Sequence, residues 1–179
     1  IFAPDIPQHH VVNHLTGEVT DQKRNVLTES ARIARGNIQP MTNYKAADYD
    51  ALLIPGGFGV AKNFRSIAIE GAKAKVDQSV EQAIRQTHAA KKPIGALCIA
   101  PALIALLLPQ AEVTIGNDKA TAQTIEQMGA KHIETSHGEV VVDEKNKIVS
   151  TPCYMLDANI VQIAEGADRI VKTLLSMMD

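Results

Sequence analysis

Short apolar runs alternate with amphipathic stretches along most of this sequence, and this alternation limits the possible folds most strongly. The runs predicted to be strands lie at 50–54, 94–97, 112–115, 139–142 and 147–150. The stretches predicted to be helices lie at 25–35, 76–90, 99–106, 121–128 and from Asp157 onward. Strands that are apolar along nearly their whole length belong to parallel sheets that helices cover on both faces. The pattern therefore predicts an α/β fold with a mostly parallel sheet.

Capping and turn residues refine the ends of these elements. Gly36 directly follows the stretch at 25–35 and is predicted to be its C-terminal cap. Asp157 precedes the last apolar stripe and is predicted to cap that helix at its N-terminus. The polar residues 143–146 separate the last two predicted strands by a tight turn, so these strands are predicted to form a hairpin.

Cys98 lies where the apolar run 94–97 turns directly into an apolar helix. Pro101 is tolerated only in the first turn of a helix, so the helix must begin immediately after the cysteine. Ala96 and Ala100, two residues to either side, are small enough for the tight corner of a nucleophile elbow. The unpaired N–H groups of a helix N-terminus favour a thiolate at such a corner. The alternative, that Cys98 is a small buried apolar side chain, stays open on this corner alone.

Two further loops follow predicted strands. Gly56, Gly57 and Gly59 come directly after the run at 50–54, and glycines there allow the backbone to approach a ligand or present N–H groups to an oxyanion. This loop lacks the Lys-Ser/Thr ending of a phosphate loop, which makes nucleotide binding a weak interpretation. The segment 151–153 follows the last predicted strand. Because ligands bind at the carboxyl ends of parallel strands, the convergence of these loops favours a functional Cys98.

Composition excludes several classes of protein. With 18 Lys and Arg against 20 Asp and Glu, the net charge of -2 provides no basic surface for nucleic acid or an anionic membrane. Two cysteines without CxxC spacing indicate a reducing compartment rather than a disulfide framework or a zinc site. His9, His10 and His14 lack a Cys or carboxylate at ligand spacing, so no metal is predicted. The 179 residues are predicted to form a single domain, 1–179, in the cytoplasm, with a processed organelle form as the alternative.

Several motifs resemble the class I glutamine-amidotransferase-like superfamily, which includes the PfpI-type proteases. The motifs are the stretches 53–59, 62–63, 93–95 and 97–101. Further stretches resemble one branch, the enhancing-lycopene-biosynthesis or sigma cross-reacting proteins, and lie at 2–5, 13–18, 24–27, 31–33, 142–144 and 146–147. The resemblance implies a flavodoxin-like three-layer sandwich, a homodimer, and conversion of glyoxal to glycolate without glutathione or another cofactor.

The resemblance also assigns roles by position. Cys98 matches the nucleophile of the superfamily, and Gly57 and Ile99 match the residues whose backbone N–H groups form the oxyanion hole. From the motifs that they occupy, the residues expected to line the substrate pocket are Gly56, Phe58, Asn63, His14 and Arg24. The glyoxalases of the superfamily add a glutamate from the loop after the first strand. No residue here matches it, and we expect that strand and that glutamate to precede Ile1.

Departures from the superfamily pattern narrow the expected chemistry. Ile99 stands where the PfpI-type proteases carry histidine, so peptidase activity is not expected. The region 151–154 lacks the His-x-Glu pair of true amidotransferases, so ammonia release from glutamine is not expected either. Cys153 stands where the family carries alanine, and its distance from Cys98 is left open by the sequence.

The sequence supports one principal hypothesis and two alternatives. The principal hypothesis is attack of the Cys98 thiolate on a small 2-oxoaldehyde to give a hemithioacetal and finally a hydroxy acid. The first alternative is a non-enzymatic redox sensor or stress-related binding protein that uses the same reactive cysteine. The second is a flavodoxin-like nucleotide carrier, which would need phosphate binding at the loop 56–59.

Overall fold

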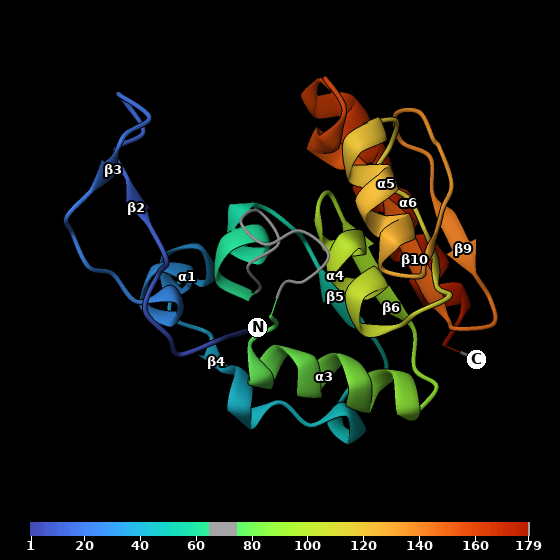
Figure 1. Ribbon diagram of the computed structural model, residues 1–179. Helices are drawn as coiled ribbons and strands as arrows, with labels where there is room; N and C mark the ends of the chain where they lie inside the picture. The colour runs from blue at the N-terminus through green and yellow to red at the C-terminus, as the bar shows by residue number, and fades with distance from the viewer. Residues whose placement is uncertain (65–74, 179) are drawn as a thin grey trace.

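The computed structural model describes residues 1–64 and 75–178, and a four-stranded sheet forms its centre (Figure 1). In spatial order the strands are β5 (Leu52–Ile54), β6 (Ile94–Leu97), β10 (Ile148–Thr151) and β9 (Val141–Asp143). The first three run parallel, and β9 pairs antiparallel with β10 as the predicted hairpin. The mostly parallel sheet predicted from the apolar runs is therefore confirmed.

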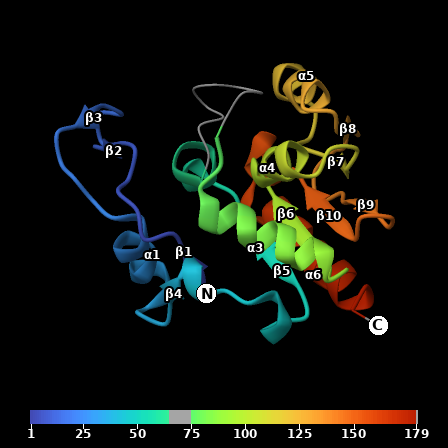
Figure 2. The same cartoon turned by 60° about the horizontal axis from the view of Figure 1, so that its bottom comes forward.

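Helices cover both faces of this sheet, as Figure 2 shows. Because successive side chains of a strand point to opposite faces, β6 contributes to two separate cores. Ile94 and Ala96 pack with α3 (Gln78–Ala89) and α4 (Ala100–Leu107) in the larger core. Leu97 packs on the other face, with residues of α6 (Ile160–Ser176). The result is the predicted α/β fold in three layers.

The remaining elements are short and lie outside the central sheet. β7 (Glu112–Val113) pairs parallel with β8 (Lys131–His132). β2 (Val11–Val12) pairs antiparallel with β3 (Val19–Thr20). The helix between β7 and β8 is α5 (Lys119–Gln127). The 3₁₀ turns are η1 (Met41–Asn43), η2 (Ala46–Asp48) and η5 (Cys153–Met155), and η3 (Val60–Phe64) is a π-helical turn. Among the described residues, no helix is both long enough and apolar enough to span a bilayer.

An apolar groove of about 780 Å³ lies between the central sheet and a separate pair of parallel strands. This pair consists of β1 (Phe2–Ala3) and β4 (Gln39–Pro40), which α1 (Val26–Ala34) connects. Residues of β1, β5, α1 and α3 line the groove. In the described part of the chain β1 pairs only with β4, and β5 pairs only with β6. The edges of the two sheets therefore face the groove without a strand between them.

Two helix caps differ from those predicted. Asn159, not Asp157, caps α6, because its side chain accepts the N–H of Gln162 while the Gln162 side chain accepts the N–H of Asn159. This reciprocal capping box satisfies two helix-terminal donors, which Asp157 cannot do from two residues upstream. At the end of α1, Arg35 takes the cap position with a left-handed φ of 51°, and Gly36 follows with φ 78°.

Candidate active site

Cys98 forms the predicted sharp corner between β6 and α4. Its φ of 59° is left-handed, a conformation that non-glycine residues rarely adopt and that is typical of a nucleophile elbow. Its backbone N–H donates a 3.0 Å hydrogen bond to the carbonyl oxygen of Thr151, which ties the corner to the end of β10. The side chain is half-buried. The cysteine is therefore held by strand and helix while its sulfur remains accessible.

Gly56 brings the loop after β5 directly against this corner. A Cβ atom on Gly56 would lie 2.5 Å from the carbonyl oxygen of Leu97 and 2.8 Å from the Cβ of Cys98. The φ of Gly56 is also left-handed, at 88°. Only glycine fits such a close approach with such a backbone conformation. The sequence predicted that this loop approaches a ligand. The loop can lie against Cys98 because Gly56 has no side chain.

Gly57 and Ile99 present backbone N–H groups that are not used elsewhere. Among the residues that the structure describes, neither N–H group donates a hydrogen bond. Gly57 is exposed with φ 84°, and Ile99 occupies the N-cap position of α4. Both residues line the cavity into which Cys98 opens. Two uncommitted donors around one thiol are what the binding of an oxyanion requires.

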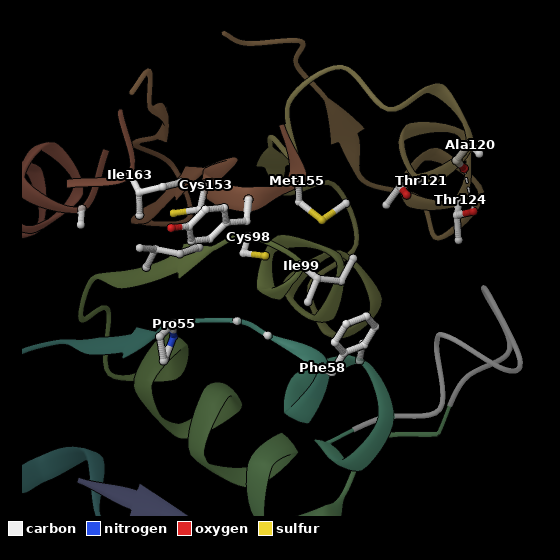
Figure 3. A pocket seen from close by; sticks show the side chains of 16 residues that line it. Pro55, Phe58, Cys98, Ile99, Ala120, Thr121, Thr124, Cys153, Met155 and Ile163 are labelled. Carbon is white, nitrogen blue, oxygen red and sulfur yellow. Dashed lines mark hydrogen bonds between the residues drawn. The ribbon is translucent and has the colours of Figure 1, made fainter. Parts of the chain in front are cut away.

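The cavity around Cys98 has a volume of about 820 Å³ and a largely apolar wall (Figure 3). It is formed by the loop after β5, the elbow, the turn η5 and parts of α5 and α6. Its lining residues are Pro55, Gly56, Gly57, Phe58, Ala61, Leu97, Cys98, Ile99, Ala120, Thr121, Thr124, Cys153, Tyr154, Met155, Ile163 and Ala167. None of these described lining residues is a carboxylate or a histidine. The described wall can therefore bind and polarise a carbonyl group, but it supplies no strong general base besides the cysteines.

Phe58 stands at the rim of this cavity. Its ring is 78% exposed, and the ammonium group of Lys62 lies 5.1 Å from the ring centroid. A cation at that distance from an aromatic face is attracted by the ring quadrupole. Phe58 and Gly56 thus lie at the cavity, where the sequence predicted a substrate pocket.

The second cysteine, Cys153, also lines the cavity, next to Cys98 (Figure 3). Burial raises the pKa of the Cys153 thiol, and the nearby Cys98 sulfur raises it further, although the backbone N–H of Cys98 partly opposes both effects. Cys153 is thus held in its protonated form. The sequence placed Cys153 on a loop at a strand end but left its distance from Cys98 open, because that distance depends on the pairing of β6 with β10.

Asn63, His14 and Arg24 do not line this cavity in the described chain. Asn63 lies in the wall of the apolar groove instead, and its Oδ1 accepts the backbone N–H of His9 at 2.8 Å. His14 and Arg24 are exposed, and Arg24 forms a 3.7 Å ion pair with Glu29. The β2–β3 region that contains His14 extends away from the central sheet (Figure 1). The motifs predicted these three residues at the substrate pocket, but the structure does not place them in the wall of the cavity around Cys98.

The described residues contain no group of three or more His, Cys, Asp or Glu side chains arranged to hold a metal ion. The three histidines near the N-terminus, His9, His10 and His14, are all exposed, in agreement with their interpretation as surface residues.

Comparisons with known proteins agree with this geometry. Residues 37–159 match the DJ-1/PfpI family. The chain is 43% identical over 187 residues to the mitochondrial ES1 protein homolog of Rattus norvegicus, covering 99% of this chain and 70% of that protein. It is 44% identical, with the same coverage, to the human mitochondrial glutamine amidotransferase-like class 1 domain-containing protein 3.

Solved structures extend the comparison. The crystal structure of an isoprenoid biosynthesis protein with an amidotransferase-like domain from Ehrlichia chaffeensis superposes with a TM-score of 0.92 at 35% identity, covering 99% of this chain and 82% of that one. Glyoxalase III from Candida albicans superposes with a TM-score of 0.57 at 14% identity, covering 86% of this chain and 69% of that one, which shows a shared fold alone. The superfamily resemblance is confirmed, whereas the enhancing-lycopene-biosynthesis branch is not singled out by these matches. On this evidence the chain belongs to the DJ-1/PfpI family of class I glutamine amidotransferase-like proteins.

Proposed function

We propose that this protein is a cysteine-dependent, glutathione-independent enzyme that converts a small 2-oxoaldehyde such as glyoxal to the corresponding hydroxy acid. The observation that carries the proposal is the combination of Cys98 at a left-handed elbow with the uncommitted N–H groups of Gly57 and Ile99 on one cavity. Covalent catalysis by a thiol needs this pairing of a nucleophile with donors for the oxygen that becomes negative.

In the first step the Cys98 thiolate attacks the aldehyde carbon, and a carbon–sulfur bond forms as the carbonyl π bond becomes an oxyanion. The N–H groups of Gly57 and Ile99 donate to that oxygen. One such donor is typically worth about 3–4 kcal/mol of transition-state stabilisation. The product of this step is a hemithioacetal on Cys98.

In the second step a base moves the proton from the carbon bound to sulfur to the neighbouring carbonyl carbon, through an enediolate. This transfer gives a thioester, and its hydrolysis releases the hydroxy acid and regenerates the thiolate. None of the described residues that line the cavity is a carboxylate or a histidine. The resemblance to the superfamily assigns this step to a glutamate that no residue of this chain matches.

The test is glycolate formation from glyoxal by the natural full-length protein, compared with its Cys98→Ser variant. Turnover should fall at least a thousandfold in Cys98→Ser, and a matching thermal unfolding curve will show that the variant is folded. Cys153→Ser is the matched control, because it removes the other thiol of the same cavity and should retain measurable turnover. Equal activity in the natural protein and Cys98→Ser would show that Cys98 is not the nucleophile.

A redox-sensing role for Cys98 is the second candidate, favoured by the second cysteine beside it in the cavity. If the natural protein has no turnover at high enzyme concentration, the aldehyde chemistry is wrong and this second role takes precedence. The homodimer and the cytoplasmic location stay predictions. The curated relatives compared above carry mitochondrial names, which supports a mitochondrial location as the competing proposal.

A further inference from the structure

Cys98 and Cys153 follow two neighbouring strands that run parallel. Leu97 at the end of β6 is paired with Thr151 at the end of β10. Cys98 is the next residue after Leu97, and Cys153 lies two residues after Thr151. The 3.0 Å hydrogen bond from the Cys98 N–H to the Thr151 carbonyl oxygen continues the pairing past the end of β6. The backbones that carry the two cysteines are therefore fixed side by side.

The two side chains meet in one cavity. Both line its wall, and both are half-buried, so small reagents can reach them. The Cys98 sulfur is close enough to raise the pKa of the Cys153 thiol, and Figure 3 shows both side chains at the same cavity. Neighbouring strands are about 4.8 Å apart, and the Cα atoms of a disulfide are usually about 4.4–6.8 Å apart. In this register Cys98 lies opposite Pro152, and Cys153 is the next residue, at the start of η5, so the disulfide forms when the two side chains turn towards each other within the cavity.

We propose that Cys98 and Cys153 form a reversible disulfide after a peroxide oxidises Cys98, with Cys153 acting as the resolving cysteine. The 179 residues contain two cysteines, so Cys98 and Cys153 are the one pair that this sequence offers. The inference goes beyond the aldehyde chemistry proposed above and does not depend on it, because oxidation uses the same sulfur with a different reagent.

The reaction balances with one hydrogen peroxide for each disulfide. The Cys98 thiolate attacks one peroxide oxygen, so a sulfur–oxygen bond forms, the oxygen–oxygen bond breaks and hydroxide leaves. Cys98 is oxidised by two electrons to a sulfenic acid, and the peroxide is reduced. The Cys153 sulfur then attacks the Cys98 sulfur, the sulfur–sulfur bond forms and the sulfur–oxygen bond breaks. The Cys153 proton leaves with the departing oxygen as water.

The protonated state of Cys153 suits its proposed role as the resolving cysteine. Because burial and the nearby Cys98 sulfur both raise the pKa of Cys153, this residue is the poorer nucleophile towards peroxide. Cys98 at the elbow is then oxidised first, and Cys153 reacts only after the sulfenic acid has formed beside it. The disulfide removes the Cys98 nucleophile reversibly and prevents its further oxidation to sulfinic acid, which thiols do not reverse.

The test treats the natural full-length protein with one equivalent of hydrogen peroxide, alkylates the remaining thiols under denaturing conditions and measures the intact mass. The natural protein should lose about 2 Da and both alkylation sites, and dithiothreitol should restore them. In Cys153→Ala, Cys98 should instead gain one oxygen, and a second equivalent of peroxide should give sulfinic acid at least tenfold faster than in the natural protein. Alanine is the matched substitution, because the superfamily resemblance predicts alanine at this position. Cys98→Ser should show no loss of mass.

Two results would overturn the inference. The first is stable addition of oxygen to Cys98 in the natural protein while Cys153 remains open to alkylation. The second is a disulfide found only between two chains, seen as a doubled mass without reductant. Neither result depends on turnover of glyoxal, so failure of this inference can be distinguished from failure of the proposed enzymatic function.

Discussion

The backbone N–H of Cys98 donates a 3.0 Å hydrogen bond to the carbonyl oxygen of Thr151. This bond joins the elbow after β6 to the last residue of β10, so the position of Cys98 is fixed by the pairing of two strands. The loop after β5 completes the site from the other side, where Gly56 lies against Leu97 and Cys98. The site is thus built at the carboxyl ends of three adjacent parallel strands, where open α/β sheets bind ligands.

Gly56→Ala should lower both the stability of the fold and the reaction rate of Cys98 with a thiol reagent, whereas Gly57→Ala should lower them less. Both residues have a left-handed φ, so either alanine costs about 1–2 kcal/mol in backbone conformation. The added methyl group of Gly56→Ala would also lie 2.5 Å from the Leu97 carbonyl oxygen, whereas that of Gly57→Ala meets no atom within 4 Å. Urea unfolding and the reaction rate of Cys98 with a thiol reagent will measure the difference. Equal effects in the two variants would contradict a close-packing role for Gly56.

Asp143→Asn should destabilise the fold at neutral pH by about 1–3 kcal/mol, because Asp143 is a buried carboxylate that accepts several hydrogen bonds. Burial raises its pKa, but hydrogen bonds from the Asn146 side chain and from the backbone N–H groups of Glu112, Asn146 and Lys145 outweigh burial and lower the pKa overall. Asparagine replaces one accepting oxygen with an NH₂ group that faces these donors. The free energy of unfolding at pH 7 tests this cost.

The same carboxylate predicts a dependence on pH. Its pKa is lower in the folded protein than the value of about 3.9 in an unfolded chain, so its stabilisation is present above that value and is lost as the pH falls through the folded pKa. The difference in stability between the natural protein and Asp143→Asn should therefore be constant at neutral pH and shrink as the pH falls below about 4, towards the folded pKa. Asp168→Asn is the control, because its ion pair with Lys172 is exposed and should contribute less than about 0.5 kcal/mol. A difference that stays constant with pH would rule out this role for the Asp143 charge.

Thr87→Val should cost more stability than Tyr44→Phe. The buried Thr87 hydroxyl donates to the Ala83 carbonyl oxygen at 2.8 Å, so its oxygen accepts the Tyr44 hydroxyl, also at 2.8 Å. Phenylalanine at 44 leaves the Thr87–Ala83 bond intact and should cost about 1 kcal/mol or less. Valine at 87 leaves the Tyr44 hydroxyl buried without its partner and should cost about 1–3 kcal/mol.

Urea unfolding of the two single variants and of the double variant measures this asymmetry. The double variant should be less destabilised than the sum of the single ones, because it has no unpaired hydroxyl at this place. The reverse order of the single variants would mean that the Tyr44 hydroxyl finds another partner when Thr87 is lost.

The features that the sequence predicted correctly are those determined by local chemistry. Pro101 and the two flanking alanines restrict the chain around Cys98 so strongly that the strand-to-helix corner can be recognised without the rest of the protein. The glycines after β5 likewise indicated a loop that approaches another part of the backbone. Apolar runs predicted the strands of the sheet, because a strand buried on both faces has few alternatives.

The features that it missed depend on pairings between distant segments. The proximity of Cys153 to Cys98 follows from the register of β10 against β6, which no local pattern encodes. The choice of Asn159 over Asp157 as a cap required the reciprocal bond with Gln162. Asn63 belongs to a motif that predicted it at the substrate pocket, but it lines the apolar groove instead. The direction of a side chain in the π-helical turn η3 does not follow from sequence spacing alone.

The groove between β1 and β5 has a consequence for the cooperativity of unfolding. Across the groove the described residues form no backbone–backbone hydrogen bonds, and the contacts include the rings of Phe2, Tyr44 and Tyr49, whose centroids lie 5.4–5.6 Å apart. A two-stranded sheet alone is only marginally stable. The N-terminal strands should therefore open and exchange their amide hydrogens well before the central sheet. An extended segment bound in the groove would join the two sheets, so that they unfold as one unit.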